Sequence, residues 1–459
     1  MRFDPVLAER RFGCGLSPKI APPGSAEAML DGLQTPDPIA DRFPIEGFET
    51  FLGRMRARAD LAKQRRDNRG TELAEAARQG IRDLNRIARK DHWHWMAAHI
   101  ARRVWTQTPF RERLAFFWAD HFTATGKRGL IRRGTSPYME DMRPHLAGRF
   151  EDLLYEAVTH PVMVHYLDQE GSVGPNSKQA QRRQGAGLNE NLAREVLELH
   201  TLGAGGPYTQ ADVRELAELL TGLTINLNVG RTFRKPLAEP GRETVLGKSY
   251  GGDNPSLNDI RAVLRDLARH PATARHIAGK LAVHFVSDTP SEALVGAVEA
   301  AWLDTDGDLT AVYRALLTHP DAWGREGANI KQPFDFVSSA CRALAVDGPM
   351  ITELREGAHL LRFSDPMRQM GHIWQKPNGP DGLDEADGAW ITPQGIAARL
   401  QWAVTVPSLL VRVLPDPRDF VETALGPDAP EAVRFAASAA ESRADGVGLV
   451  LASPAFQRM

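Results

Sequence analysis

The densest cluster of side chains that could do chemistry lies in residues 189–200, which read NENLAREVLELH. On a helix, side chains three or four positions apart share a face, so Glu195 and Glu198 are expected to lie side by side. Paired carboxylates can hold a divalent cation or exchange protons with a substrate, which makes both glutamates candidate catalytic residues. The candidate binding residues on the same helix are Asn189, Glu190, Asn191 and Arg194.

The same segment also fits a purely structural interpretation. Arg194 stands four residues after Glu190 and four before Glu198, which is the spacing of an ion-pair ladder on a helix surface. Each exposed step of such a ladder contributes only about 0.3–0.5 kcal/mol. Asparagine is a weak helix former, and a ladder does not explain Asn189 and Asn191 apart from one N-cap. Both interpretations therefore stay open.

Three further residues could complete a site. His121 lies in the aromatic run FFWADHF at 116–122, where burial would lower its pKa and leave it neutral, able to act as a ligand or base. The alternative is a core histidine that is hydrogen-bonded to a carbonyl group. His200 lies about 200° around the helix from Glu198, so we expect it to pack against the core. Asp168 is a candidate ligand or base from a neighbouring element.

The composition argues against several classes of protein. The 459 residues include 56 Lys and Arg against 58 Asp and Glu, so nothing overall indicates nucleic-acid binding. The arginine-rich stretch 54–69 is interrupted by Asp60 and Asp67 and is interpreted as a solvated helix face. Cys14 and Cys341 form no zinc-binding pattern, and whether they pair is left open. No apolar run reaches the roughly 18 residues of a membrane span.

Helical periodicity dominates the chain and predicts a mainly α, multi-helical globular fold. Because single cores stop growing beyond roughly 250–300 residues, two fused helical lobes are expected. The predicted divisions are a lobe at 1–223 that carries the 189–200 motif, an irregular or hairpin insert at 224–254, and a lobe at 255–459. The second lobe contains a Pro/Gly/Asp-rich loop at 376–393. Expected long helices cover 50–67, 71–105 and, after an N-cap at Thr108, 109–122.

Several motifs together resemble one bacterial family. They are the arginine pair and glycines at 10–15, the aromatic element FWADHF at 117–122, the motif at 189–199, and the elements at 208–213, 220–222 and 370–378. By these motifs the chain is similar, over nearly its whole length, to the family called domain of unknown function 1800. It departs from the family at Ala119, where many members have a second histidine, at His200, where phenylalanine is usual, and at 380–382, where Pro-Asp-Gly replaces Gly-Trp.

The resemblance implies a helical fold and the candidate residues above, but no reaction. It also implies an exported or periplasmic location and a partner protein of the domain of unknown function 1501 family. The N-terminal sequence instead predicts a cytoplasmic chain or one whose signal has been trimmed, because no apolar stretch follows Arg10 and Arg11 as it would in a signal peptide.

Two functional hypotheses follow. The first is a helical protein that works with an exported or envelope-associated partner. The alternative is a metal-assisted hydrolase-type enzyme that uses Glu195, Glu198 and His121, with a divalent metal such as magnesium, calcium or manganese on oxygen ligands.

Overall fold

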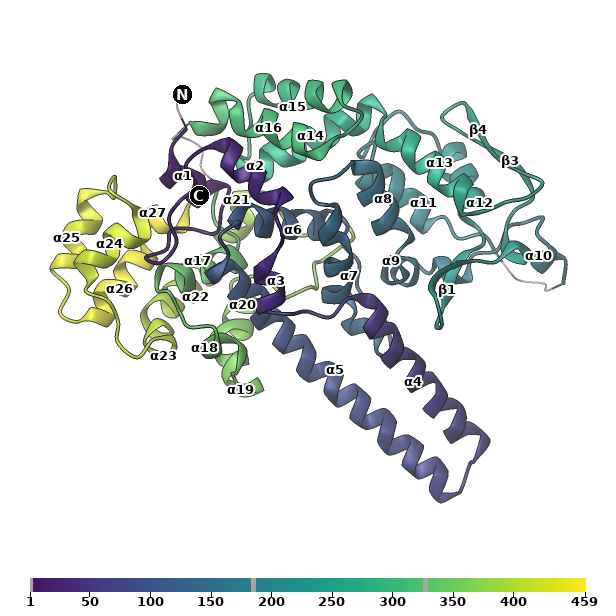
Figure 1. Ribbon diagram of the computed structural model, residues 1–459, viewed down its shortest axis with the longest axis horizontal. Coiled ribbons are helices and arrows are strands. Elements are labelled where there is room, and N and C mark those ends of the chain that lie inside the picture. Colours follow the sequence, from purple (N-terminus) through teal and green to yellow (C-terminus); the bar gives the residue numbers. More distant parts are fainter. Residues whose placement is uncertain (1–2, 183–186, 325–328) are drawn as a thin grey trace.

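The computed structural model describes residues 3–182, 187–324 and 329–459 (Figure 1). Nearly all regular structure is helical, which confirms the predicted mainly α class, and the strands form two small antiparallel hairpins. Among the described helices, none combines the length and apolar character needed to cross a bilayer. Cys14 and Cys341 are both buried and unpaired, so the open question of a disulfide is resolved.

In the first half of the chain, the regular elements of the described residues up to Leu220 are all helical. Its α-helices are α1 (Pro5–Arg11), α2 (Ala26–Gln34), α3 (Pro38–Arg42), α4 (Phe48–Asp67), α5 (Glu72–Trp105), α6 (Pro109–His121), α7 (Thr135–Met142), α8 (Phe150–Thr159), α9 (Pro161–Tyr166), α10 (Lys178–Arg182), α11 (Asn191–Glu195) and α12 (Gln210–Leu220). The 3₁₀ turns are η1 (Ile131–Arg133), η2 (Arg143–His145) and η3 (Gln169–Gly171), and η4 (Val196–His200) is a π-helical segment that continues α11.

Local sequence explains most of these boundaries. Pro109 opens α6, as predicted, because proline is well suited to a first helical position. Thr108 occupies the N-cap position of α6, as predicted, but its side chain makes no capping hydrogen bond and instead contacts the Thr106 hydroxyl. Thr209 and Asp212 form a reciprocal capping box that starts α12.

Helices α4 and α5 form a long antiparallel hairpin that projects from the rest of the molecule (Figure 1). Gly80 on α5 allows their close approach, because a Cβ there would lie 2.9 Å from the Leu61 side chain. Arg65 and Arg66 are exposed, which agrees with the solvated helix face expected for this stretch.

Two separate hairpins occupy the segment predicted as an insert. Strand β1 (Leu223–Asn226) pairs with β2 (Gly230–Phe233), and β3 (Gly241–Val245) pairs with β4 (Lys248–Gly252). The irregular or hairpin insert expected at 224–254 thus consists of two hairpins, each closed on itself. Leu246 and Gly247 both have positive φ and make a two-residue turn, which returns the chain directly into β4.

The second half is again helical. Its helices are α13 (Leu257–Ala268), α14 (Pro271–Phe285), α15 (Glu292–Asp304), α16 (Leu309–Thr318), α17 (Pro333–Ala343), α18 (Pro349–Thr352), α19 (Glu356–His359), α20 (Asp365–Gln369), α21 (Asp387–Trp390), α22 (Pro393–Thr405), α23 (Pro407–Leu410), α24 (Pro417–Leu425), α25 (Glu431–Ser438), α26 (Arg443–Ala452) and α27 (Pro454–Gln457), with short helical turns η5 (Lys235–Leu237), η6 (Pro320–Trp323) and the π-helical η7 (Leu360–Ser364).

Buried arginines connect distant parts of the chain. Arg11 donates hydrogen bonds to the carbonyls of Ala322 and Gly324, at 2.6 and 2.7 Å. Asp335 on α17 is paired with Arg103 of α5 and with Arg113 of α6. One continuous cluster of buried apolar side chains runs from α1 to α27. The predicted division into two lobes stays a prediction.

Candidate active site

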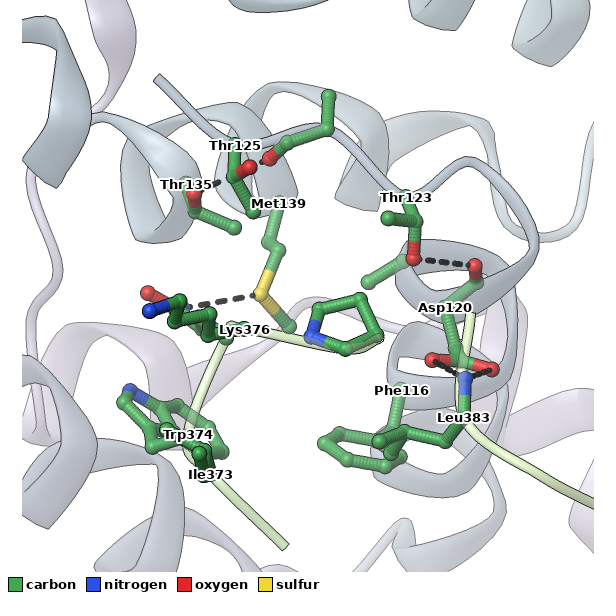
Figure 2. A pocket seen from close by; sticks show the side chains of 14 residues that line it. Phe116, Asp120, Thr123, Thr125, Thr135, Met139, Ile373, Trp374, Lys376 and Leu383 are labelled. Atoms are coloured by element: carbon green, nitrogen blue, oxygen red, sulfur yellow. Dashed lines mark hydrogen bonds between the residues drawn. The ribbon is translucent and has the colours of Figure 1, made fainter. Parts of the chain in front are cut away.

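A small cleft with a cavity of about 40 Å³ opens where three segments meet (Figure 2). Its walls come from the end of α6 and the residues after it, from α7, and from the loop at 373–383. Phe116 and Asp120 lie on one side of the cleft, and Trp374 and Lys376 lie on the other (Figure 2). Pockets for whole small organic molecules typically enclose about 300–1,000 Å³, so in this conformation the cleft has room for a few water molecules or for one small group of a ligand.

Asp120 holds the loop at the edge of this cleft. Its two carboxylate oxygens accept the backbone N–H of Leu383, at 2.9 and 3.1 Å. Gly382 makes this approach possible: its φ is +91°, and a Cβ there would lie 2.6 Å from Asp120 Oδ2. A residue with a side chain would be excluded both by the backbone conformation and by the carboxylate.

The pKa of Asp120 is raised to about 8. Burial is the largest cause, and the negative charges of Glu385 and Asp381 raise it further, whereas the hydrogen bond from the Leu383 N–H and the charge of Lys280 lower it. Asp120 is therefore largely protonated at neutral pH. A protonated carboxyl group on the wall of a cleft is able to donate a proton to a bound molecule.

Two polar groups of the cleft have no protein partner. Trp374 Nε1 and Gln375 Oε1 are buried, and neither has a hydrogen-bond partner among the described residues. Buried polar groups are normally satisfied, so an unsatisfied donor and acceptor beside a cleft indicate a place for ligand or water. The rings of Phe116 and Trp374 stack with centroids 6.4 Å apart and provide an apolar surface.

The ion-pair ladder expected from the sequence is present. Arg194 contacts Glu190 and Glu198, each at 3.3 Å, and these side chains are about one-third exposed. Arg194 also donates to Gln210 of α12, which in turn donates to Glu190 at 2.8 Å. Glu198 additionally accepts a hydrogen bond from the Tyr208 hydroxyl, so its carboxylate is already engaged.

The two asparagines behave differently from each other. Asn189 accepts the backbone N–H of Asn191 at 2.9 Å and donates to the carbonyl of Leu167 at 2.9 Å. Asn189 therefore starts the motif helix and ties it to the end of α9, which explains an asparagine at this position. Asn191 is exposed at the first position of α11.

Glu195 is the carboxylate of the motif that stays available for chemistry. It is half-buried, and within the described residues it forms no ion pair. Burial raises its pKa to about 7, and the nearby charges of Glu198 and Asp381 add to this effect. Asp381 thus raises the pKa of both Glu195 and Asp120, so the loop that carries Asp381 is close enough to affect the motif helix and the cleft.

His121 contacts the backbone of the motif helix and not its carboxylates. Its Nε2 lies 3.3 Å from the carbonyl of His200, and His276 Nε2 lies 3.2 Å from the carbonyl of Leu199. Both imidazoles thus contact backbone carbonyl groups at the end of the π-helical segment. Burial holds the pKa of His121 well below its usual range, and its Nδ1 has no partner in the described structure. His200 is buried, which confirms that it packs inward.

Asp168 lies apart from these carboxylates. It pairs with Lys127 at 2.6 Å, and both side chains are about half exposed. Glu195 and Glu198 therefore lie on one helix, and His121 contacts the backbone of that helix. Asp168 forms a surface ion pair near the start of the same helix.

Two groups of side chains are close enough to share a metal ion in the described part of the chain, and neither contains a residue predicted from the motif. One consists of Glu215, Glu218 and Glu243. The other consists of Asp141, Glu156 and His160, whose donors and acceptors are already matched. There, His160 Nδ1 accepts the Val162 N–H, so Nε2 of the neutral ring carries the proton that it donates to Asp141. Glu156 pairs with Arg231 at 3.0 Å.

Sequence reasoning missed Asp120, Lys280 and Asp381. A signal for Asp120 was present, because it is a lone carboxylate in the aromatic run at 116–122. The sequence carries no comparable signal for Lys280 on α14, whose charge reaches Asp120 only through the tertiary fold.

A family model described as "Protein of unknown function (DUF1800)" matches residues 9–458. No curated protein matches the chain. No solved structure matches it either.

Proposed function

This chain belongs to the DUF1800 family of proteins of unknown function, and we propose that it is an enzyme whose cleft binds a small organic molecule. In this proposal, Asp120 exchanges a proton with the bound molecule as a general acid. The observation that carries the proposal is a carboxyl group with a raised pKa in a cleft that also contains an unsatisfied donor and acceptor.

Glu195 does not line the cleft, and in this proposal it is a second titratable group beside the site. Its pKa of about 7 suits both donation and acceptance of a proton near neutral pH, and the charge of Asp381 raises its pKa as it raises that of Asp120. Glu198 and His121 position this region, Glu198 through Arg194 and His121 through the carbonyl of His200. A metal bound by Glu195 and Glu198 would need a third ligand, and the described residues bring none close enough to both.

Ligand binding in the cleft can be tested without knowing the substrate. Ala119 lines the cleft, so Ala119→Phe should fill it, while Ala57→Phe on the exposed face of α4 is a matched control. A library of small molecules is screened by thermal shift against all three proteins. We expect some compounds to stabilise the wild type and Ala57→Phe but not Ala119→Phe. Equal stabilisation of all three proteins would overturn the proposed binding site.

The catalytic role needs a different variant. Asp120→Asn keeps the size of the side chain and one acceptor for the Leu383 N–H but cannot transfer the proton. Compounds found in the screen should bind this variant, while their turnover should fall at least 100-fold, the usual contribution of a general acid. Unchanged turnover would remove Asp120 from the mechanism and leave a binding protein.

A second candidate function is the binding of a partner protein, as the family resemblance implies, and one exposed surface supports this function. Helices α22 and α23, at 393–410, carry a single charged residue, Arg399, which is buried. Ile396, Leu400 and Val404 repeat at four-residue spacing on the outer face of α22 and are 40–46% exposed. Exposed apolar faces of this kind typically mark protein interfaces.

The partner proposal is tested with a protein of the domain of unknown function 1501 family from the same genome. Leu400→Glu should weaken binding at least tenfold, while Leu303→Glu on α15, where the leucine is similarly exposed, should not. Absence of binding by the wild type, or equal binding by both variants, would refute this interface.

A further inference from the structure

A second pocket lies beside the first half of α4 and shares no residue with the Asp120 cleft. Its walls come from α4, from the residues that lead into η1, from β1 and the turn after it, and from the end of α9 with η3. Its cavity of about 510 Å³ falls within the range of about 300–1,000 Å³ that is typical of pockets for small organic molecules. The pocket is therefore large enough for a whole ligand.

One part of the lining is apolar. Its side chains come from α4, from the start of η1 and from the first hairpin, and they are Met55, Ala59, Leu130, Ile131, Ile225 and Leu227. Such a surface gains free energy when it is covered by the hydrocarbon part of a ligand, because apolar area is removed from water.

The charged residues of the pocket leave one positive charge without a partner. Arg128 pairs with Glu170 at 3.3 Å, whereas Arg58 forms no ion pair and no side-chain hydrogen bond in the described part of the chain. The Nε atom of Arg58 is buried and lacks an acceptor among the described residues. Buried polar groups are normally satisfied, so this guanidinium group indicates a place for an oxygen of an anionic ligand.

Gly129 leaves the end of the Arg58 side chain uncovered. Its φ is +63°, and a Cβ there would already lie 3.7 Å from Arg58 Nη1, in van der Waals contact with the guanidinium group. A longer side chain would start at this nitrogen atom. Glycine therefore suits this position both for its backbone conformation and for the space that it leaves beside the cation.

His165 adds a buried acceptor to the same pocket. Its side chain is 7% exposed, and its Nδ1 lies 3.2 Å from Glu170 Oε1. The hydrogen bond from His165 is the main cause that lowers the pKa of Glu170, so this carboxylate is ionised and Nδ1 carries the ring proton. Nε2 of the neutral ring is then an acceptor, and it has no donor within the described structure. The pocket thus lacks an acceptor for Arg58 and a donor for His165.

We propose that this pocket binds a phosphate monoester whose organic part is apolar. An ionised phosphate oxygen accepts a hydrogen bond from Arg58, and a monoester, whose second pKa is about 6, can keep one P–OH group that donates to His165 Nε2. An ionised carboxylate has acceptors only and would leave Nε2 unsatisfied. The organic part lies against the apolar lining. This site stands independently of the proposed enzymatic function, because the two pockets share no residue.

The test is calorimetric titration of the full chain with phenyl phosphate at pH 6.5, where part of the ester still carries its P–OH group. Phenyl phosphate should bind the wild type at one site per chain, and benzoate, with the same ring on a carboxylate, should bind at least tenfold more weakly. Arg58→Gln should weaken the binding of phenyl phosphate at least tenfold. Arg65→Gln removes the same charge from an exposed position of α4 and should leave the binding unchanged.

Three results would overturn the proposal: no binding of phenyl phosphate by the wild type, equal binding by Arg58→Gln, or benzoate binding as tight as that of phenyl phosphate. Loss of binding by Arg65→Gln or by Ala119→Phe, in place of Arg58→Gln, would put the probe at the tip of the hairpin or in the Asp120 cleft and would overturn the site equally. If Arg58→Gln does not fold, Ala59→Phe replaces it, because this partly exposed residue also lines the pocket. Unchanged binding by Ala59→Phe would then refute the site.

Discussion

Asp120 and Glu195 are carboxyl groups that the folded protein keeps protonated at a higher pH than the unfolded chain does. Their folded-state pKa values are about 8 and about 7, against ordinary values of 3.8 and 4.5. Between these two pKa values the carboxyl group is ionised in the unfolded chain but protonated in the folded protein. The folded protein therefore loses stability as the pH rises towards the folded-state pKa, and the loss is constant above it. Functional sites often contain such groups, because the perturbed pKa that suits catalysis lowers the stability of the fold.

For Asp120, this relation predicts a stabilising substitution. Asp120→Asn cannot ionise, so it should equal the wild type near pH 4 and become more stable between about pH 4 and pH 8. Allowing for solvent screening of a partly exposed group, the gain at pH 8 should be on the order of 2 kcal/mol. Urea unfolding at pH 5 and at pH 8 measures it. A difference that does not depend on pH would show that the folded protein does not perturb this carboxyl group.

Glu195→Gln should also increase folding stability, but over a lower range of pH. Its gain in stability should appear between about pH 4.5 and pH 7 and should stay constant above that. Glu198→Gln is the matched control, because it weakens the contacts with Arg194 and Tyr208 and should cost up to about 1 kcal/mol. If both variants lose stability at pH 8, Glu195 is only another rung of the ladder.

At the level of elements, the loop at 376–385 depends on two anchors. Asp120 holds the Leu383 N–H, and Glu385 contacts His284 Nδ1 at 2.9 and 3.0 Å. Arg113 donates to His284 Nε2, which leaves the ring proton on Nδ1, facing Glu385. The wall of the cleft is thus attached to the buried ion pairs around Asp335.

Removing the second anchor should loosen this wall. Glu385→Ala should cost about 1–3 kcal/mol, because it leaves a buried imidazole N–H unsatisfied. Amide hydrogen exchange at 376–385 should become faster, whereas exchange in α8 should not. Asp384→Ala, at the exposed neighbour, should leave the exchange unchanged. Equal exchange in wild type and Glu385→Ala would mean that Asp120 alone fixes the loop.

Elements defined by local chemistry could be predicted from the sequence. The long helices expected at 50–67 and 71–105 are present as α4 and α5, and the predicted start of α6 at Pro109 is confirmed. The π-helical turn at 196–200 could not be predicted, because histidines of α6 and α14 hold its terminal carbonyls. The contact of the loop with Asp120 joins residues 263 positions apart and depends on the whole fold.

In the molecule as a whole, many histidines are buried and neutral. Burial lowers the pKa of six of them well below the usual 6.5: His92, His99, His121, His200, His359 and His372. Below pH 6.5 the unfolded chain binds protons that the folded chain does not, so stability is present above pH 6.5 and is lost as the pH falls.

This predicts steep acid denaturation. Each such histidine costs about 1.4 kcal/mol per pH unit below 6.5, so six cost about 8 kcal/mol per unit, against a typical total stability of about 5–15 kcal/mol. The raised carboxyl groups, including Asp120 and Glu195, oppose only part of this loss. The thermal midpoint should therefore fall sharply between pH 6.5 and pH 5. A midpoint that is constant or rises over this range would contradict the buried, neutral state of these histidines.

The most direct test of the central claim is crystallographic screening of the wild-type protein with small organic fragments at neutral pH. Fragments should collect in the cleft between Phe116 and Trp374, with polar atoms bonded to Asp120, to Trp374 Nε1 or to Gln375 Oε1. Fragments that bind elsewhere while this cleft holds none would contradict the account that Asp120 serves a substrate site.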